Sequence, residues 1–273
     1  MSTTMKEKFL ELAIKAAKSA GEITLNYFNK NIEITHKGNL DNDLVTEVDK
    51  KSEKCIIDIV KEQYPEHLFL AEESGMTGTT SDVKWIIDPL DGTVNYAHGV
   101  PIFSISIAVE VEGEIVVGVV FDPTRNELFT SKKGEGAFLN GNKISVSDST
   151  ELSKSMIVTG FPYNIKTNPF NCIDIFKSFL LSSRALRRLG SAAIDAAWVA
   201  AGRFDGFYEV TLQPWDSAAG ALLVSEAGGK TTNFMTDAFS VYEKSVIFTN
   251  GKIHDEMKEL IKKQINLFDN IAH

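Results

Sequence analysis

Two aspartates close an apolar stretch of the chain, at a place where carboxylates could hold a metal ion. Trp85-Ile86-Ile87 has the character of a buried strand, and it is followed by Asp88-Pro89-Leu90-Asp91-Gly92-Thr93. Proline lacks an N–H donor and glycine tolerates unusual dihedral angles, so we expect the strand to stop here and both acids to project from a tight bend. Hard oxygen ligands at a strand end suit Mg²⁺, and Gly92-Thr93 could open a helix whose free N–H groups receive a phosphate. The alternative is an ordinary surface turn, because aspartate, proline and glycine are common turn residues.

Further acids elsewhere in the chain favour the metal hypothesis. Phe69-Leu70-Ala71 predicts a short strand, and Glu72 and Glu73 follow it directly. Two strand ends that both finish in carboxylates indicate a metal cluster rather than a solvated acidic corner. Asp49 lies near the start of one expected helix and Asp216 near the start of another, where helix capping is the competing interpretation for each.

The first half of the chain predicts helices that cover a mainly antiparallel sheet. Helical spacing of apolar residues extends over 5–29 and again from Asp49 to Tyr64, before Pro65. Strict alternation over 102–111 and 115–121 predicts a β-hairpin. Short strands are expected at 128–131, 137–139 and 143–146, and irregular loops at 32–43 and 75–81.

The second half alternates strands with helices. Strands are expected at 156–159, 185–189, 207–209 and 245–249, with helices at 170–181, 191–202, 217–227 and 253–268. No linker separates the halves, so we expect a single domain over residues 1–273, with subdomains 1–150 and 151–273.

Composition limits the classes of function. The 273 residues are 43% hydrophobic and 24% charged, as in a globular protein, and the net charge of −9 argues against nucleic-acid binding. Metal ions can still reverse the charge locally, so phosphate esters remain possible ligands. Cys55 and Cys172 are expected as reduced core residues, which favours the cytoplasm. We find no signal peptide and no apolar run of membrane-spanning length, so no membrane association is expected.

Taken in order, these motifs resemble the inositol monophosphatase family. The resemblance rests on Asp49, Glu72-Glu73, Asp88 to Thr93, and Trp215-Asp216 with the downstream Glu226-Ala227-Gly228-Gly229. Gly190-Ser191-Ala192 and Phe207-Tyr208-Glu209 also fall in the order and spacing that the family uses for its substrate. The likeness extends over essentially the whole chain, and several linked motifs are far more specific than any one of them.

This resemblance implies a mixed α/β or α+β fold, a layered αβαβα sandwich of the sugar phosphatase type, in a protein that is usually a homodimer. It also implies a Mg²⁺-dependent, lithium-inhibited phosphomonoesterase with two to three metal ions per site. The metal ligands implied are Glu72, Asp88, Asp91, Asp216 and the carbonyl of Leu90. Thr93, oriented by Asp49, would help Glu72 to activate water. The substrate contacts implied are the N–H groups of Gly92 and Thr93, together with Gly190, Ser191, Ala192, Glu209 and Asp216.

Two residues receive looser roles by the same resemblance. Glu73 would stand behind the metal ligands, and Lys37 would lie near a weaker third metal site.

The resemblance leaves the substrate open. An inositol monophosphate or a related sugar phosphate would be hydrolysed by metal-activated water attack, whereas fructose bisphosphate and the 2′-phosphate of a dinucleotide such as NADP are alternatives at the same site. Arg184, Arg187 and Arg188 could contact a second phosphate, or they could pair with surface acids. A different class also stays open, in which the protein chiefly binds other macromolecules.

Overall fold

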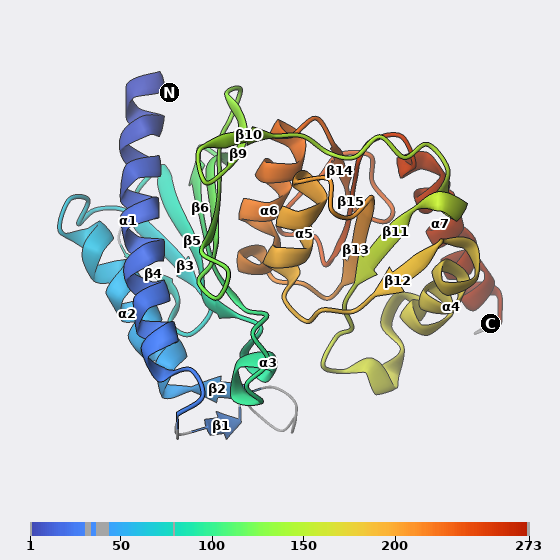
Figure 1. Ribbon diagram of the computed structural model, residues 1–273, viewed down its shortest axis with the longest axis horizontal. Coiled ribbons are helices and arrows are strands. Elements are labelled where there is room, and N and C mark those ends of the chain that lie inside the picture. Colours follow the sequence, from blue (N-terminus) through green and yellow to red (C-terminus); the bar gives the residue numbers. More distant parts are fainter. Residues whose placement is uncertain (1, 31–33, 37–43, 79, 272–273) are drawn as a thin grey trace.

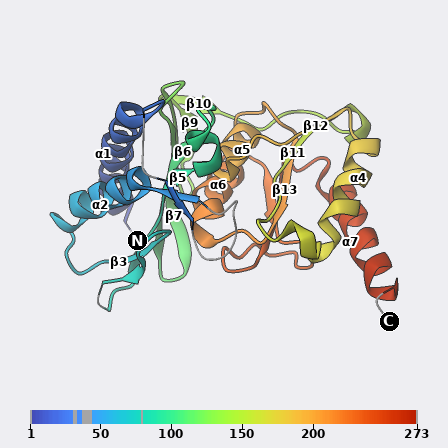
Figure 2. The ribbon, with the colours of Figure 1, turned by 90° about the horizontal axis from the view of Figure 1, so that it is seen from below.

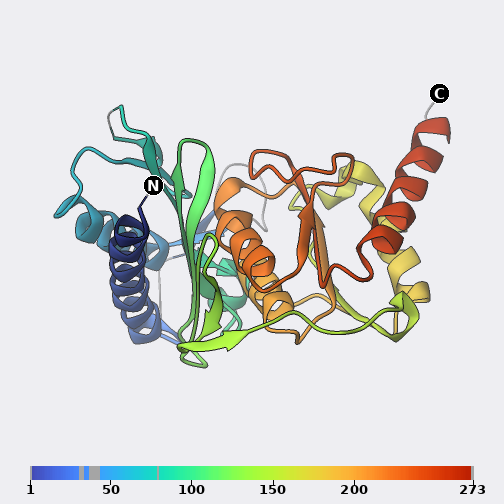
Figure 3. The same cartoon turned by 90° about the horizontal axis from the view of Figure 1, so that it is seen from above.

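The computed structural model describes residues 2–30, 34–36, 44–78 and 80–271. Its chain forms five layers, in which two sheets alternate with three layers of helices (Figure 1). The same layers are visible from below and from above in Figures 2 and 3. The layered αβαβα sandwich expected from the resemblance is therefore confirmed.

The first layer consists of α1 (Thr3–Tyr27) and α2 (Glu47–Lys61), which lie on the outer face of the larger sheet. The buried stripe of α1 is rich in alanine, so the helix axis approaches the sheet closely. A Cβ atom on Gly21 would lie 2.5 Å from the Phe121 ring, which makes glycine necessary at that contact. Ser2 caps α1, and Thr46 and Asp49 form a capping box at the start of α2.

The larger sheet has eight strands in the order β10-β9-β8-β7-β6-β5-β3-β4. Their bounds are β3 (Leu68–Ala71), β4 (Gly75–Thr77), β5 (Val83–Asp91), β6 (Ser104–Val111), β7 (Glu114–Asp122), β8 (Glu127–Lys132), β9 (Gly136–Leu139) and β10 (Asn142–Ile144). β3 and β5 are parallel, and the other neighbouring pairs are antiparallel, as the sequence predicts for this part. The sequence predicts a loop at 75–81, and this prediction is wrong for residues 75–77, which form β4. Three residues are too few to show an alternating pattern.

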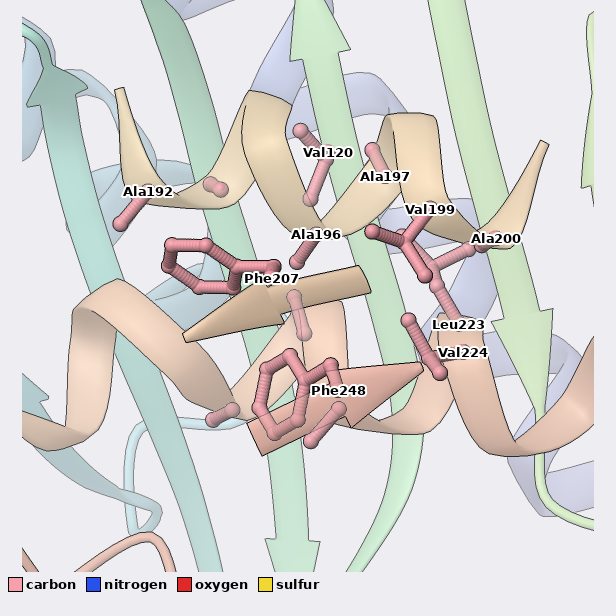
Figure 4. Packing of buried hydrophobic residues seen from close by; sticks show 14 of the residues in the cluster. Val120, Ala192, Ala196, Ala197, Val199, Ala200, Phe207, Leu223, Val224 and Phe248 are labelled. Carbon is pink, nitrogen blue, oxygen red and sulfur yellow. The ribbon is translucent and has the colours of Figure 1, made fainter. Parts of the chain in front are cut away.

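The central layer is formed by α5 (Ala192–Ala200) and α6 (Pro214–Glu226), packed between the two sheets (Figure 4). Both helices are lined with small residues, and a Cβ atom on Gly220 would overlap the Cβ atom of Ala196. Phe207 and Phe248 close this core from the smaller sheet, with ring centroids 5.9 Å apart in edge-to-face geometry. Close packing of this kind fixes the starts of both helices relative to β5.

The smaller sheet has five strands in the order β12-β11-β13-β15-β14. Their bounds are β11 (Met156–Thr159), β12 (Ala185–Arg187), β13 (Gly206–Val210), β14 (Lys230–Thr232) and β15 (Ser245–Thr249). The last layer, α4 (Cys172–Ser182) and α7 (His254–Ile271), covers its outer face, and three single 3₁₀ turns connect elements: η1 (Leu152–Lys154), η2 (Ile165–Thr167) and η3 (Pro169–Asn171). β14 has no counterpart among the expected elements, and α6 begins three residues earlier than predicted.

A small β-ribbon and a short helix lie below the larger sheet in Figure 1. β1 (Ile34–His36) pairs antiparallel with β2 (Leu44–Thr46), so the irregular loop expected at 32–43 is wrong for residues 34–36. The short helix is α3 (Thr93–Ala97). Lys37 lies outside the described residues.

Two further sequence expectations concern membranes and cysteines. None of the helices in the described ranges has both the length and the apolar character needed to cross a membrane. Cys55 and Cys172 are free thiols, as expected, but only Cys172 is buried, whereas Cys55 is partly exposed on α2.

His254, at the start of α7, is a fully buried histidine held between two hydroxyls. Its Nε2 lies 3.1 Å from Thr232 Oγ1 and its Nδ1 lies 3.0 Å from Thr249 Oγ1. The pKa of this imidazole is lowered to about 4, mainly by burial and in part by the charges of Lys230 and Lys258, against the opposing effect of Asp255 and Asp237. The folded protein therefore holds His254 in its neutral form.

We expect His254 to make folding stability depend on acid pH. Because its pKa is about 6.5 unfolded and about 4 folded, its contribution is complete above pH 6.5 and is lost as the pH falls toward 4. The loss should reach about 2–3 kcal/mol by pH 4. Urea unfolding at pH 7 and pH 4.5 should show a smaller decrease for His254→Gln than for the wild type, while the exposed-site control His98→Gln keeps the wild-type decrease. Equal decreases in all three proteins would contradict the assignment.

Candidate active site

The centre of the site is a bulge in β5. The strand does not stop at Pro89 as expected, but continues to Asp91 with a register shift between Asp88 and Asp91 against β6. Pro89 fits there because a bulge leaves one residue without a ladder hydrogen bond. Ser52 Oγ on α2 donates to the Pro89 carbonyl at 2.7 Å and fixes the bulge from behind. The bulge turns both aspartates into the interior rather than onto a surface turn, so the surface-turn alternative is wrong.

Asp88 is buried with few partners of its own. It is 2% exposed, and its Oδ1 accepts a hydrogen bond of 3.1 Å from the N–H of Leu90. Burial raises the pKa of Asp88 well above its usual value, and the charges of Glu72, Asp91 and Asp216 raise it further. An anion in this position is stabilised poorly by the described protein groups alone.

Asp91 reaches across the molecule to the start of α5. Its Oδ2 accepts hydrogen bonds from Ser191 Oγ at 2.6 Å and from the Ala193 N–H at 2.7 Å, and its Oδ1 accepts from the Ala192 N–H at 3.3 Å. A carboxylate at a helix N-terminus is favoured by the free N–H groups and the helix dipole. Burial nevertheless raises the pKa of Asp91, against the lowering effect of these bonds. Ser191 and Ala192 therefore contact Asp91 as well as line the cavity.

Asp216 lies in the first turn of α6 and accepts a hydrogen bond of 2.6 Å from the Gln213 N–H. It does cap the helix, from the third helical position, as the competing interpretation proposed. Burial raises its pKa well above the usual value, and Asp91 and Glu72 raise it further, so it belongs to the same group of acids. Glu72 follows β3, and its N–H donates to the Ile87 carbonyl at 3.2 Å, which sets it beside β5.

Thr93 and Asp49 form a hydroxyl–carboxylate pair at the beginning of α3. Thr93 Oγ1 lies 3.1 Å from Asp49 Oδ1 and 3.0 Å from the carbonyl oxygen of Leu90. Asp49 Oδ2 accepts from the N–H of Thr46 at 2.8 Å, so its orientation is fixed by α2. Burial raises the pKa of Asp49. The capping interpretation of Asp49 is correct, and the same carboxylate also engages Thr93.

Gly92 permits this arrangement. Its φ of +97° is a left-handed conformation, and a Cβ atom would lie 2.9 Å from the Ile102 carbonyl oxygen. Asn95, three residues further on, donates through Nδ2 to the carbonyls of Ile102 at 2.9 Å and Leu189 at 2.8 Å. Asn95 therefore joins α3 to the loop before α5.

A cavity of about 460 Å³ collects most of the predicted residues. Those that line it are Glu72, Asp91, Gly92, Thr93, Gly190, Ser191, Ala192, Glu209 and Asp216. Asp88, Leu90 and Asp49 are absent from this lining and are buried behind it. The site thus has a carboxylate-rich floor at β5 and opens toward β13.

The far end of the cavity contains residues that the sequence did not single out. Asp195 on α5 and Gly160 after β11 line it together with Glu209 and Arg188. Asp195 is 1% exposed, and its Oδ1 has no hydrogen-bond partner in the described structure. Glu209 does not pair with Arg203, which forms a two-bonded ion pair with Glu127. A lone aspartate among alanines gave no periodic or motif signal.

The acids at the floor have the chemistry of a site for a hard divalent cation. Within the described ranges, no three His, Cys, Asp or Glu side chains already form a finished ligand group. The fit rests instead on the donor set: buried carboxylate oxygens from β5 and α6 raise one another's pKa, which a divalent cation would reverse. Oxygen ligands of this type suit Mg²⁺.

Comparison with known proteins agrees with this geometry. A model of the inositol monophosphatase family matches residues 5–266. The chain is 42% identical over 265 residues to Nus factor SuhB of Escherichia coli (strain K12), covering 93% of this chain and 98% of SuhB. It is 41% identical over 261 residues to the chloroplastic phosphatase IMPL1 of Arabidopsis thaliana, covering 92% of this chain and 69% of IMPL1.

A solved structure leads to the same result. The inositol monophosphatase from Anabaena (Nostoc) sp. PCC 7120 superposes with a TM-score of 0.84 at 39% identity, over 94% of this chain and 96% of that one. The family match spans nearly the whole chain, and both relatives exceed 40% identity. The chain therefore belongs to the inositol monophosphatase family.

Proposed function

We propose that this protein is a Mg²⁺-dependent phosphomonoesterase that hydrolyses an inositol monophosphate or a related sugar phosphate. One observation carries the proposal: Glu72, Asp91 and Asp216 meet in a cavity that Asp88 underlies, and their charges raise the pKa of Asp88. A group of acids that destabilise one another is unfavourable for folding alone, so a function that uses a cation accounts for it.

Under this proposal, Glu72, Asp88, Asp91, Asp216 and the Leu90 carbonyl would hold the Mg²⁺ ions. When bound, Mg²⁺ supplies Lewis-acid chemistry that activates water and neutralises charge on phosphate and leaving group. The Gly92 and Thr93 N–H groups would bind phosphate oxygens.

Thr93 and Asp49 would move a proton during the reaction. The 3.1 Å contact lets Thr93 Oγ1 accept a proton from the attacking water while its own proton passes to Asp49 Oδ1. Glu72, at the cavity wall, would orient that water from the other side. Gly190, Ser191, Ala192 and Glu209 line the part of the cavity that would receive the alcohol.

The test is a hydrolysis panel with purified protein and Mg²⁺. It should include myo-inositol 1-phosphate, fructose 1,6-bisphosphate, NADP and 4-nitrophenyl phosphate. We expect release of phosphate that is fastest from the inositol ester, that stops when EDTA is added and that decreases with lithium. Absence of Mg²⁺-dependent release from every ester would contradict the proposal.

A second candidate function follows from the name of one relative. Escherichia coli SuhB is named a Nus factor, and this name does not describe hydrolysis of a phosphate ester. We therefore also propose that this chain binds a macromolecular partner in addition to its phosphatase role. If the two roles are separate, a variant that no longer hydrolyses phosphate esters should still restore the phenotype of cells that lack this protein. Failure of complementation by a folded, inactive variant would favour the phosphatase role alone.

Three expectations remain predictions: the subdomain boundary near residue 150, the cytoplasmic location and the homodimer. Light scattering coupled to gel filtration would test the last of these.

A further inference from the structure

Two acids stand at the end of the cavity away from the metal-binding floor. Asp195, on α5, and Glu209, on β13, both line this end. Asp195 is 1% exposed, and its Oδ1 is a buried acceptor without a donor. An unpartnered buried acceptor costs about 1–3 kcal/mol, so a ligand that supplies a donor would recover that cost.

The backbone around Glu209 keeps its carboxylate in the cavity. A Cβ atom on Gly160 would overlap both carboxylate oxygens of Glu209, so the glycine leaves just enough space for them. Glu209 follows Tyr208 on β13, whose pairing with β11 and β15 fixes the direction of the side chain. The carboxylate of Glu209 is thereby set at a defined position beside Asp195.

Arg188 is the basic residue at this end, and the two acids partly neutralise it. The guanidinium lies near the position of a Gly190 Cβ atom, at 2.8 Å from Nη1, and its charge lowers the pKa of both Asp195 and Glu209. Burial, which has the largest effect, and the charge of Asp91 raise the pKa of Glu209 to about 8 against this lowering. Two carboxyl groups thus share this end of the cavity with one guanidinium.

These observations distinguish a substrate whose alcohol portion is neutral and carries hydroxyl groups from one whose alcohol portion carries a second phosphate. A hydroxyl group both donates and accepts, so it can hydrogen-bond a carboxyl group in either protonation state. A second phosphate is an anion with acceptor oxygens, and it would bring up to two negative charges to a place where two carboxyl groups already face one arginine. Two acids against one arginine thus favour a neutral alcohol with hydroxyl groups.

We propose that Asp195 is a further specificity-determining residue, which accepts a hydrogen bond from a second substrate hydroxyl beside the one bound by Glu209, and which excludes a second phosphate. This inference rests on the proposed phosphatase function and deepens it. The substrate is then the monophosphate of a neutral alcohol with at least two free hydroxyls. Arg188 offsets part of the charge of the two acids and does not bind a phosphate.

The test compares three esters for the wild type, Asp195→Ala, Asp195→Asn and the exposed-site control Asp174→Ala. 4-Nitrophenyl phosphate serves as the reference, because it has no hydroxyl on its leaving group. The ratio of kcat/KM for myo-inositol 1-phosphate to that for the reference should fall about tenfold in Asp195→Ala. Asp195→Asn keeps an acceptor oxygen but removes the charge, so its ratio should be close to that of the wild type. Its kcat/KM for fructose 1,6-bisphosphate should be higher than that of the wild type. Asp174→Ala should match the wild type.

Two more variants address the neighbours of Asp195. Gly160→Ala keeps both acids but displaces Glu209, so it should lower the same ratio. Arg188→Gln should not selectively reduce use of the bisphosphate. A selective reduction there, or a ratio unchanged in Asp195→Ala, would overturn the inference.

Binding of the free alcohol separates this inference from the proposed function. If no ester is hydrolysed, the phosphatase proposal fails, and saturation-transfer NMR with myo-inositol then decides the inference. Binding to the wild type that is weakened in Asp195→Ala supports it. Equal binding to both proteins, or to neither, overturns it.

Discussion

Asp88→Asn is expected to remove nearly all phosphatase activity while making the metal-free protein more stable. The amide oxygen can still accept the hydrogen bond from the Leu90 N–H, so the β5 bulge should persist. Burial and three neighbouring acids raise the pKa of Asp88, so replacing the anion with a neutral group removes an unfavourable charge. We expect kcat/KM to fall roughly 10³-fold, because a ligand to the cation is lost.

Thermal unfolding separates these two effects without relying on turnover. In EDTA, Asp88→Asn should unfold at a higher temperature than the wild type, by at least about 1 kcal/mol, or about 2–4 °C. Added Mg²⁺ should raise the unfolding temperature of the wild type but not that of the variant, since only a protein that binds the ion is stabilised by it. Asp174→Asn, an exposed change on α4, should behave as the wild type in both conditions. A variant that keeps its Mg²⁺ response and its turnover would remove Asp88 from the metal site.

The sequence predicts the layers of the fold because each layer depends on patterns that are local in the chain. Helical spacing over α1 follows from burial of one face, and the structure confirms it. The hairpin of β6 and β7 is confirmed as well, but nearly every residue of these two strands is buried, so their alternation does not mark an exposed face. Strands of three residues, such as β4 and β14, are too short for any period, and only their neighbours in the sheet define them. Pro89 misleads for a related reason: a bulge held by Ser52 accommodates a residue that an isolated strand would reject.

The residues of the candidate site also fall into two groups: those that local sequence patterns predict and those that only tertiary packing brings together. The acids around β5 are recognisable because several of them follow strand ends, and because they recur in one order along the chain; capping alone would account for Asp49 and Asp216 at their helix starts. Asp91 and Ser191, however, are 100 residues apart in sequence, and their 2.6 Å contact depends on the packing of α5 against the sheet. Asp195 and Gly160 belong to different elements and meet only around Glu209. Tertiary packing alone brings Asp195 and Gly160 to this cavity, so no local pattern could predict their place in it.

Thr93→Val is the second change for which a large effect is expected. Valine has nearly the same shape as threonine, but it removes the hydroxyl that lies between Asp49 Oδ1 and the Leu90 carbonyl oxygen. The proton from the attacking water then has no path to Asp49, and we expect kcat to fall about 100-fold. The KM should change much less, because the N–H of residue 93, which would bind the phosphate, is retained.

Thr93→Ser is the matched control, because it keeps the hydroxyl and loses only the methyl group. Thr93 is 6% exposed, so this methyl group is buried. Its kcat should lie within about tenfold of the wild-type value and well above that of Thr93→Val, because the hydroxyl is kept and only a less restricted χ1 angle weakens its alignment with Asp49. Measuring kcat and KM separately for the three proteins distinguishes proton transfer from substrate binding. If valine and serine reduced kcat equally, the hydroxyl would have no part in the reaction, and Asp49 would be only the cap of α2. If valine raised KM and left kcat unchanged, Thr93 would contribute to phosphate binding rather than to proton transfer.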